Sequence, residues 1–465
     1  MKKISVLLAV AMIASLFAAF AVTASAEESI WDGTYPEVNA EAAFGGGSGT
    51  VDDPYLISSA ADLAQLCVNS NSEDKIKDYY GGIYFKFTVD IILNENYSEY
   101  ASWGTTPPAN VWTPIAQNLA DNNSMSGGIF KGILYGAGHV IKGMYVKDDS
   151  EKWTMAAGFI GMMGGDIYKL GFENCYVEAN STAGVGAGII AASLGNTNIN
   201  NVTKCDQCYV KDSYVSAWRG AGLISGITPH TYVTNCYSTG TVNVGREEGE
   251  ADCSGLCAWC NSASSEVTIE NCYTVFKMTG GTGICGNIMG NVTSGVATID
   301  NCYFDSQYSD VENAFGWVCE DSKEYCYAED LQSAQMTVSK MSFKNSVWSD
   351  AEGGTPVLSV FASPEEADAD IVTGESADPG IPDTDPVTSE PDDSTVPVTD
   401  ENPGEITEPG TKEADTTEKN NETGPAPDTD KAGEKDKTFP IWIPIAAAVL
   451  VIAVVAGVII TKKKR

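Results

Sequence analysis

The triplet Asn271-Cys272-Tyr273 returns several times along the middle of the chain. Further copies begin at Asn174, Asn235 and Asn301, and a partial copy, Cys208-Tyr209, falls between the first two. The steps between copies are roughly 28 to 36 residues, which is the period of solenoids that stack one structural unit several times. The triplet therefore predicts a repeat architecture.

Around the triplets, short strands alternate with glycine turns up to about residue 310. Examples are Gly158-Phe159-Ile160-Gly161, Gly222-Leu223-Ile224-Ser225-Gly226 and Gly283-Ile284-Cys285-Gly286. This pattern contains no long amphipathic helix, so it predicts an all-β domain. One short helix is expected over residues 59–68, where Ser59-x-x-Asp62 has the form of a helix start. A helix there would cap an exposed end of the solenoid.

Several pieces occur in a recognisable order: the entry Asp53-Pro54-Tyr55-Leu56-Ile57, then Trp112-Thr113-Pro114-Ile115, then Gly136-x-Gly138-His139, then the triplets, and finally Pro356-Val357-Leu358. In this order the region from Gly47 to about Leu358 resembles bacterial surface proteins with a right-handed parallel β-helix of the pectate-lyase-like type, carrying GLUG-like repeats. The resemblance implies a β-helix solenoid. Two features depart from the family pattern: the Gly-Leu-Val-Gly repeat core is degenerate, and Tyr135 replaces the usual turn aspartate.

The two ends carry targeting patterns. Residues 1–26 have the charged start, apolar run and Ala24-Ser25-Ala26 site of a cleaved signal peptide. Residues 363–437 are acidic, rich in proline and threonine and poor in large apolar side chains, which predicts a disordered stalk. Residues 438–461 are long and apolar enough for one transmembrane helix, and the basic tail 462–465 predicts a cytoplasmic C-terminus. The β-helix repeat domain is then 27–362, outside the cell.

The formal net charge is −36. Such a chain repels nucleic acid and anionic lipid surfaces, so neither is expected as a partner. The expected partners are an extracellular glycan or protein, and the membrane only through the C-terminal helix.

The cysteines of the triplets predict an interior ladder, because equivalent residues of successive coils stack above one another. The expected ladder comprises Cys175, Cys208, Cys236, Cys272 and Cys302. The accompanying asparagines are expected to bond backbone groups at the turns: Asn174, Asn235, Asn271 and Asn301. The chain has 13 cysteines, an odd number that cannot pair completely; packing thiols with some disulfide pairs are expected.

Zinc is the alternative for Cys253, Cys257 and Cys260, with Cys285 as a fourth ligand. Repeat register explains these cysteines more simply, and no metal or other cofactor is expected. The two histidines, His139 and His230, lie in no recognisable catalytic pattern and are expected to be structural.

Trp153, Trp218 and Trp259 each lie near an expected coil turn, where an exposed indole would stack on a sugar or meet a partner. The alternative for all three is packing in the core. They are the candidate ligand-binding residues.

Enzymatic chemistry on this fold would need facing carboxylates for hydrolysis, or acidic ligands beside a basic residue for a lyase. The nearest acidic pair, Asp148-Asp149, lies in a polar loop, and the central arginines Arg219 and Arg246 lie in no suitable acidic cluster. We therefore expect a non-catalytic, membrane-anchored surface protein for binding or adhesion. The alternatives are a polysaccharide lyase or glycoside hydrolase, and a passive spacer of the cell envelope.

Overall fold

The computed structural model describes residues 28–72, 80–117, 128–149, 155–179, 186–195, 202–244, 251–280, 283–352 and 354–362. The chain divides into two units, Met1–Pro382 and Asp383–Arg465, and every residue of the second unit lies outside these ranges. The same holds for the predicted signal peptide, stalk, membrane helix and basic tail. Within the described ranges, no helix is both long and apolar enough to cross a bilayer.

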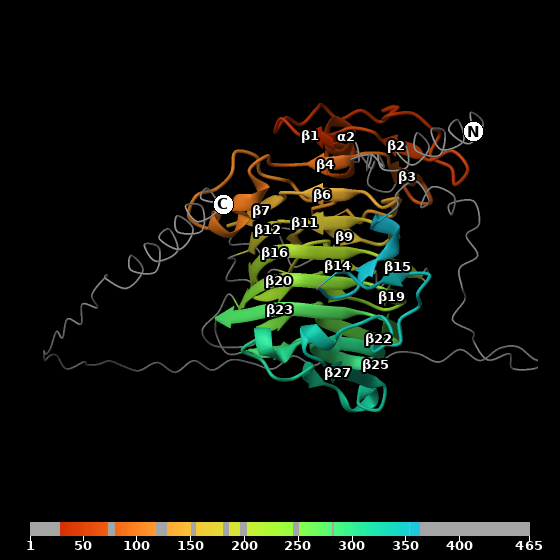
Figure 1. Ribbon diagram of the computed structural model, residues 1–465. Helices are drawn as coiled ribbons and strands as arrows, with labels where there is room; N and C mark the ends of the chain where they lie inside the picture. The colour runs from red at the N-terminus through yellow and green to blue at the C-terminus, as the bar shows by residue number, and fades with distance from the viewer. Residues whose placement is uncertain are drawn as a thin grey trace, which may run out of the picture. The chain divides into compact units, whose positions relative to one another are not determined.

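The described part is mostly β, with a 22-stranded sheet whose pairings are all parallel. Equivalent strands of successive coils pair in register, and Figure 1 shows the coils stacked from β4 to β27. This arrangement is that of a β-helix-like solenoid, as the repeat pattern predicted. The stack consists of three walls and an outer sheet.

The first wall stacks β9 (Ile160–Met163), β14 (Ala191–Leu194), β18 (Ile224–Ile227), β22 (Cys257–Glu270), β25 (Met289–Phe304) and β26 (Phe315–Val318). The second wall stacks β2 (Tyr55–Ile57), β3 (Tyr84–Phe87), β5 (Ile133–Tyr135), β10 (Ile167–Tyr168), β15 (Thr203–Asp206), β19 (Thr231–Thr234), the later parts of β22 and β25, and β27 (Cys326–Asp330).

The third wall stacks β1 (Glu28–Ile30), β4 (Asp90–Ile92), β6 (Val140–Lys142), β11 (Gly171–Glu173), β16 (Tyr209–Ala217), β20 (Tyr237–Val244) and β23 (Tyr273–Gly280). It continues round a corner through β7 (Tyr145–Asp148) and β12 (Tyr176–Ala179). The outer sheet comprises β8 (Met155–Ala157), β13 (Gly186–Gly188), β17 (Arg219–Ala221), β21 (Asp252–Ser254) and β24 (Ile284–Gly286).

The degenerate glycine motifs of the repeat join the outer sheet to the first wall. Small residues are needed there because the backbones approach closely: a Cβ at Gly222 would overlap the carbonyl oxygen of Gly255. This packing explains why glycine recurs shortly before the first-wall strands β9, β14, β18, β22 and β25.

The helix predicted over residues 59–68 is present as α2 (Ala60–Ser70). Ser59 is its N-cap, and the Ser59 side chain accepts a hydrogen bond from the Asp62 backbone nitrogen at 3.2 Å. Leu63 and Leu66 are buried in the same core cluster as Phe85 of β3. Figure 1 places α2 at the N-terminal end of the stack. The remaining short helices are η2 (Tyr97–Ser102), η3 (Ser306–Tyr308), η4 (Glu320–Ser322), η5 (Ser333–Gln335) and η6 (Ser359–Phe361).

After β27 the chain turns back along the stack as a C-terminal segment, residues 331–352 and 354–362 (Figure 1). It contains the antiparallel pair β28 (Trp348–Ser349) and β29 (Val357–Leu358). Its apolar side chains pack on a column of four tyrosines, Tyr209, Tyr237, Tyr273 and Tyr303. The hydroxyl of Tyr273 donates to the Pro356 carbonyl at 2.6 Å.

The cysteine ladder is divided between two corners of the coil. The tyrosine register places Cys208, Cys236, Cys272 and Cys302 in one column, and all four are buried. Cys175 lies elsewhere, because Tyr176 pairs with Tyr145 and Tyr214 rather than with Tyr209. The prediction that Cys175 belongs to the same ladder is therefore wrong. All thirteen cysteines are free in the structure.

The asparagines of the triplets occupy left-handed backbone positions, with φ between 48° and 56° at Asn174, Asn235, Asn271 and Asn301. Asparagine tolerates this conformation better than other non-glycine residues. Asn301 Nδ2 donates to Asn271 Oδ1 at 2.7 Å, and Asn235 Nδ2 to Asp206 Oδ1 at 2.8 Å. For Asn235, Asn271 and Asn301 the expected side-chain bonds to backbone groups are replaced by side-chain contacts between coils.

Replacing Asn271 by alanine should lower the free energy of unfolding by about 1–2 kcal/mol, because alanine is sterically strained in the left-handed conformation of this corner. Asn271→Gly relieves that cost and loses only the contact with Asn301, so its effect should be smaller. Denaturant titrations of both variants measure the difference. Equal destabilisation by alanine and glycine would contradict a backbone role for this corner.

Candidate functional site

Two of the three tryptophans predicted to bind ligand converge on one arginine. Arg219 begins β17, directly after Trp218, and its guanidinium carbon lies 5.2 Å from the centroid of the Trp218 ring and 5.3 Å from that of Trp259. Both indoles are half-buried, and contacts of this kind hold a cation against the negative faces of the rings. Trp153 lies outside the described residues.

A buried carboxylate fixes the arginine from its other side. Arg219 Nε donates to Asp252 Oδ2 at 2.9 Å, and the Asp252 side chain is only 2% exposed. Asn291 Nδ2 donates to the second carboxylate oxygen at 3.0 Å. Asp252 is therefore bound on both oxygens, and its charge is balanced by Arg219. We call Trp218, Arg219, Asp252, Trp259 and Asn291 the arginine cluster.

The sequence prediction missed the partnership of Arg219 and Asp252, because it required the acidic residues to be near the arginine along the chain. The two residues are 33 positions apart and lie side by side because β17 and β21 are consecutive strands of the outer sheet. A search for acidic residues one repeat period after Arg219 in the sequence would have found Asp252.

The strand register extends the arginine cluster toward the last coil. Trp259 pairs with Asn291, and Asn291 pairs with Trp317 of β26. Trp259 and Trp317 are thus two coils apart, about 10 Å at the usual strand spacing. Trp317 is 48% exposed, whereas Trp259 is partly covered. The sequence reasoning did not name Trp317.

The arginine cluster presents hydrogen-bond donors beside aromatic faces. Arg219 is 22% exposed, and its two Nη nitrogens have no hydrogen-bond partner among the described residues. They can donate to a hydroxyl or carboxylate, while the indole faces offer apolar surface for stacking. Asp252 is the carboxylate of the cluster, and it is already paired.

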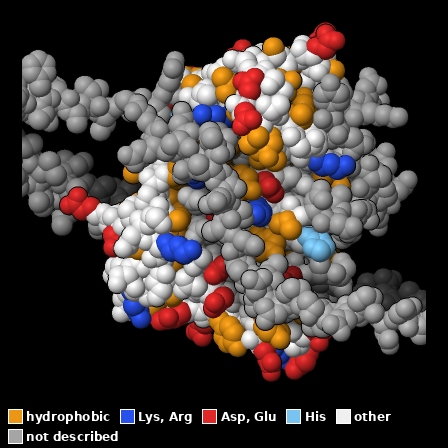
Figure 2. Space-filling view, turned by 90° about the vertical axis from the view of Figure 1, so that its right-hand side faces the viewer, with side chains coloured by type: hydrophobic (Ala, Val, Ile, Leu, Met, Phe, Trp, Pro, Cys, Tyr) orange, Lys and Arg blue, Asp and Glu red, His pale blue; other side chains and the backbone are white. Residues whose placement is uncertain are grey.

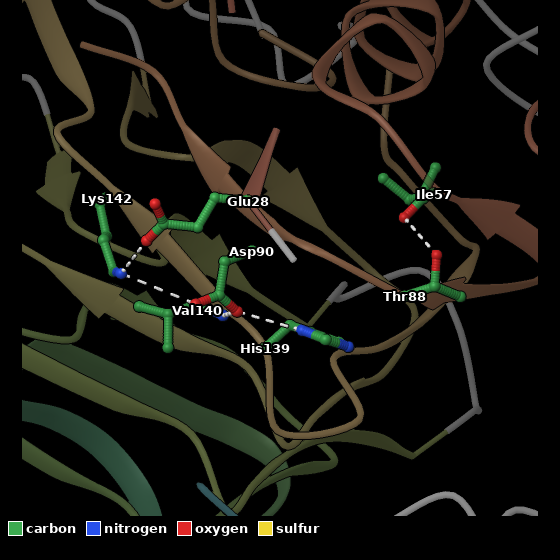
Figure 3. Close-up of polar contacts among 7 residues, drawn as sticks. All are labelled: Glu28, Ile57, Thr88, Asp90, His139, Val140 and Lys142. Carbon is green, nitrogen blue, oxygen red and sulfur yellow. Dashed lines mark hydrogen bonds and ion pairs between the residues drawn. The ribbon is translucent and has the colours of Figure 1, made fainter. Parts of the chain in front are cut away.

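A second polar cluster lies on the third wall near the N-terminal end (Figure 3). Asp90 Oδ1 lies 3.1 Å from His139 Nδ1 and accepts from the Val140 backbone nitrogen at 3.0 Å. Lys142 Nζ donates to Glu28 Oε1 at 2.9 Å and lies 3.7 Å from Asp90 Oδ2.

Its electrostatics do not suit a lyase base. Burial lowers the pKa of Lys142, but the hydrogen bond to Glu28 and the charges of Asp90 and Glu28 outweigh burial and raise it. The amine is therefore held protonated, whereas a general base must be neutral. Asp90 ties His139, the Val140 nitrogen and Lys142 to one point, which fits a structural role for the cluster.

The two aspartates considered for hydrolysis, Asp148 and Asp149, have different surroundings. Asp148 is buried, whereas Asp149 is exposed and lies 3.7 Å from Lys147. Lys147 also lies 3.7 Å from Glu178. These contacts are those of a polar corner between coils.

The cysteines considered as zinc ligands pack within the stack: Cys253, Cys257 and Cys260 are buried, and Cys285 is half-buried. In the described ranges, no three His, Cys, Asp or Glu side chains are grouped so as to hold a metal ion. Cys253 and Cys285 are register partners in the outer sheet. A hydrogen bond from Cys253 lowers the pKa of the Cys285 thiol below its usual 9.0.

Cys285 should therefore be the first cysteine to react with iodoacetamide in the native protein, because the thiolate is the reactive form. Cys326 is similarly half-buried, but burial and the neighbouring thiols Cys319 and Cys302 raise its pKa to about 12. Timed alkylation at about pH 8, followed by peptide mass spectrometry, measures the order of reaction. Earlier labelling of Cys326 than of Cys285 would contradict it.

Comparisons with known proteins identify no family. No family model matches the chain, and no curated protein matches it. A solved structure from Bacteroides ovatus, described as a "putative immunoglobulin A1 protease", is 18% identical with a TM-score of 0.45. The alignment covers 70% of this chain and 98% of that one.

Proposed function

We propose that this protein is a non-catalytic surface protein that binds a glycan along the flank formed by the arginine cluster and Trp317. The observation that carries the proposal is the convergence of Trp218 and Trp259 on Arg219, whose Nη donors have no hydrogen-bond partner among the described residues. In this proposal the solenoid is a right-handed parallel β-helix with GLUG-like repeats. A signal peptide, stalk and membrane helix hold it at the cell surface, with the basic tail in the cytoplasm.

Sugars present apolar C–H faces and many hydroxyls, so they are recognised by aromatic faces combined with a few fixed polar groups. The flank offers both. Two indoles in one column, about 10 Å apart, can contact more than one sugar ring, and the Nη groups of Arg219 lie beside the first indole. Asp252 and Asn291 hold the guanidinium in place, which reduces the entropy lost on binding.

The alternative of a polysaccharide lyase or glycoside hydrolase on the same fold is less well supported. Hydrolysis requires two carboxyl groups facing each other across the bond. The arginine cluster contributes one, and it is already paired on both oxygens. A protein ligand on the same flank and a passive spacer of the cell envelope are the remaining alternatives.

The purified full chain can be screened on a glycan array and on an array of extracellular matrix proteins. The proposal expects selective glycan binding that weakens about tenfold in Trp317→Ala, since stacked aromatic contacts of this kind are worth about 1 kcal/mol or more. Tyr308→Ala is the matched control, because Tyr308 is a similarly exposed aromatic outside the column of Trp259, Asn291 and Trp317. Binding that is insensitive to Trp317, or confined to proteins, would overturn the glycan proposal; no binding on either array would favour the spacer.

A further inference from the structure

The last coil of the solenoid ends in strands with a free edge. In the described part of the chain, β27 pairs only with β25, and so does β26. The backbone of β27 makes no other hydrogen bond to the backbone of a described residue. An edge of this kind presents a row of N–H and C=O groups that can pair with another extended chain.

Aromatic side chains stand exposed at this edge. Tyr325 precedes β27 and is 48% exposed, and Tyr327 within β27 is 60% exposed. The opposite end of the stack differs, because α2 lies there with its apolar side chains buried in the core. The last coil thus combines an unpaired edge with large apolar rings in water, which is the usual character of an interaction surface.

The surroundings of the edge are strongly acidic. Residues 305–330 contain eight acidic side chains and one lysine, and all of the acidic ones except Asp305 are exposed. Figure 2 shows acidic side chains gathered around hydrophobic ones at the lower end, where Figure 1 places β27. Such a field attracts cations and repels a second copy of the same end.

We propose that the free edge of β27, with Tyr325 and Tyr327, is a docking surface for an extended polypeptide segment rich in lysine or arginine. The segment would add as one more strand, with its backbone pairing with β27. Its basic side chains would face the exposed acidic side chains of residues 305–330, which we call the acidic rim. Acidic residues alone would serve to keep an edge from aggregating, but that purpose is not served by exposed tyrosines at the same edge. The stalk of this chain is itself acidic, so it does not suit the surface.

The test uses the full chain and a fluorescent peptide of five Lys-Thr repeats, measured by anisotropy. The same peptide with alternate backbone nitrogens methylated keeps its charge but cannot pair as a strand. Binding of the first peptide and loss of binding with the second are expected. Equal binding of both peptides would overturn strand addition, as would no binding of either.

Two charge-reversal variants locate the surface. Asp321→Lys with Glu324→Lys reverses two exposed charges of the acidic rim and should weaken binding about tenfold or more, since like charges then face each other. Glu37→Lys with Glu41→Lys makes the same change in net charge at exposed positions near the other end of the chain, and should leave binding nearly unchanged. Equal weakening by both pairs would show attraction by net charge only and would overturn the proposed site.

Tyr325→Ser with Tyr327→Ser should weaken binding without changing the charge, because the tyrosines supply the apolar contact. Both side chains are largely exposed, so the variant should fold; circular dichroism checks this. Unchanged affinity in a folded variant would contradict the docking surface. These outcomes are independent of glycan binding at the arginine cluster.

Discussion

Replacing Trp348 by alanine is expected to lower the free energy of unfolding by about 3–5 kcal/mol. Trp348 is 1% exposed, and its ring stacks on Phe343 at 4.6 Å between centroids. The same ring lies 6.0 Å from Tyr237 and 5.8 Å from Tyr273. Alanine would remove the centre of the contact between the C-terminal segment and the tyrosine column, and would leave a cavity there.

Guanidinium titrations followed by far-ultraviolet circular dichroism measure the loss, and limited proteolysis of residues 331–352 and 354–362 reports release of the segment. Trp317→Ala is the control, because a largely exposed indole should cost less than about 0.5 kcal/mol. Trp348→Phe keeps an aromatic ring and removes Nε1, a buried donor without a hydrogen-bond partner among the described residues. Trp348→Phe should lower the free energy of unfolding much less than Trp348→Ala does. A small effect of Trp348→Ala would contradict the packing of the C-terminal segment on the tyrosine column.

Replacing Arg219 by methionine is expected to lower the free energy of unfolding by about 3 kcal/mol, the lower end of the range for one partner of a buried ion pair. The lower end applies because Arg219 itself is 22% exposed, whereas its partner Asp252 is 2% exposed. Methionine fills the space beside the two indoles but removes the guanidinium that pairs with the buried Asp252 carboxylate. Chemical denaturation measures the change.

The double variant Arg219→Met with Asp252→Asn separates charge from packing. It removes both charges while keeping the shapes, so it should recover most of the loss. It should not recover glycan binding, because the Nη donors remain absent. A double variant that is as unstable as Arg219→Met alone would contradict the view that the pair is held together by its charges.

The strands and their period could be predicted because both are local: alternating apolar residues mark each strand, and the triplet marks a corner. The alignment of the first triplet, Asn174-Cys175-Tyr176, with the later triplets could not be predicted. Some coils have two corners with a left-handed residue, such as Lys169 and Asn174 in one coil and Gln207 and Asp212 in the next; Asn235 lies at the first kind of corner and Asn174 at the second. Both favour asparagine for the same steric reason, so the sequence around each looks alike, and only the pairing of Tyr176 with Tyr145 and Tyr214 separates them.

The candidate site was predictable in part. Trp218 and Trp259 could be named from their places near turns, but their convergence depends on where one coil stacks on the next. Arg219 meets Asp252 across 33 residues, and Asn291 meets Asp252 across 39. Neither pairing has a local signature. Trp317 follows from the same register, because β26 continues the column that contains Trp259 and Asn291.

The most direct test of the central claim, that the protein binds a glycan without cleaving it, is a mass measurement on the bound glycan. The glycan that binds most tightly on the array is incubated with the full chain for many hours and then released. Its mass is measured by mass spectrometry. We predict that it is recovered at its original mass, and that its retention on the protein depends on Trp317. Shortened products, formed with hydrolytic or unsaturated ends, would contradict the account.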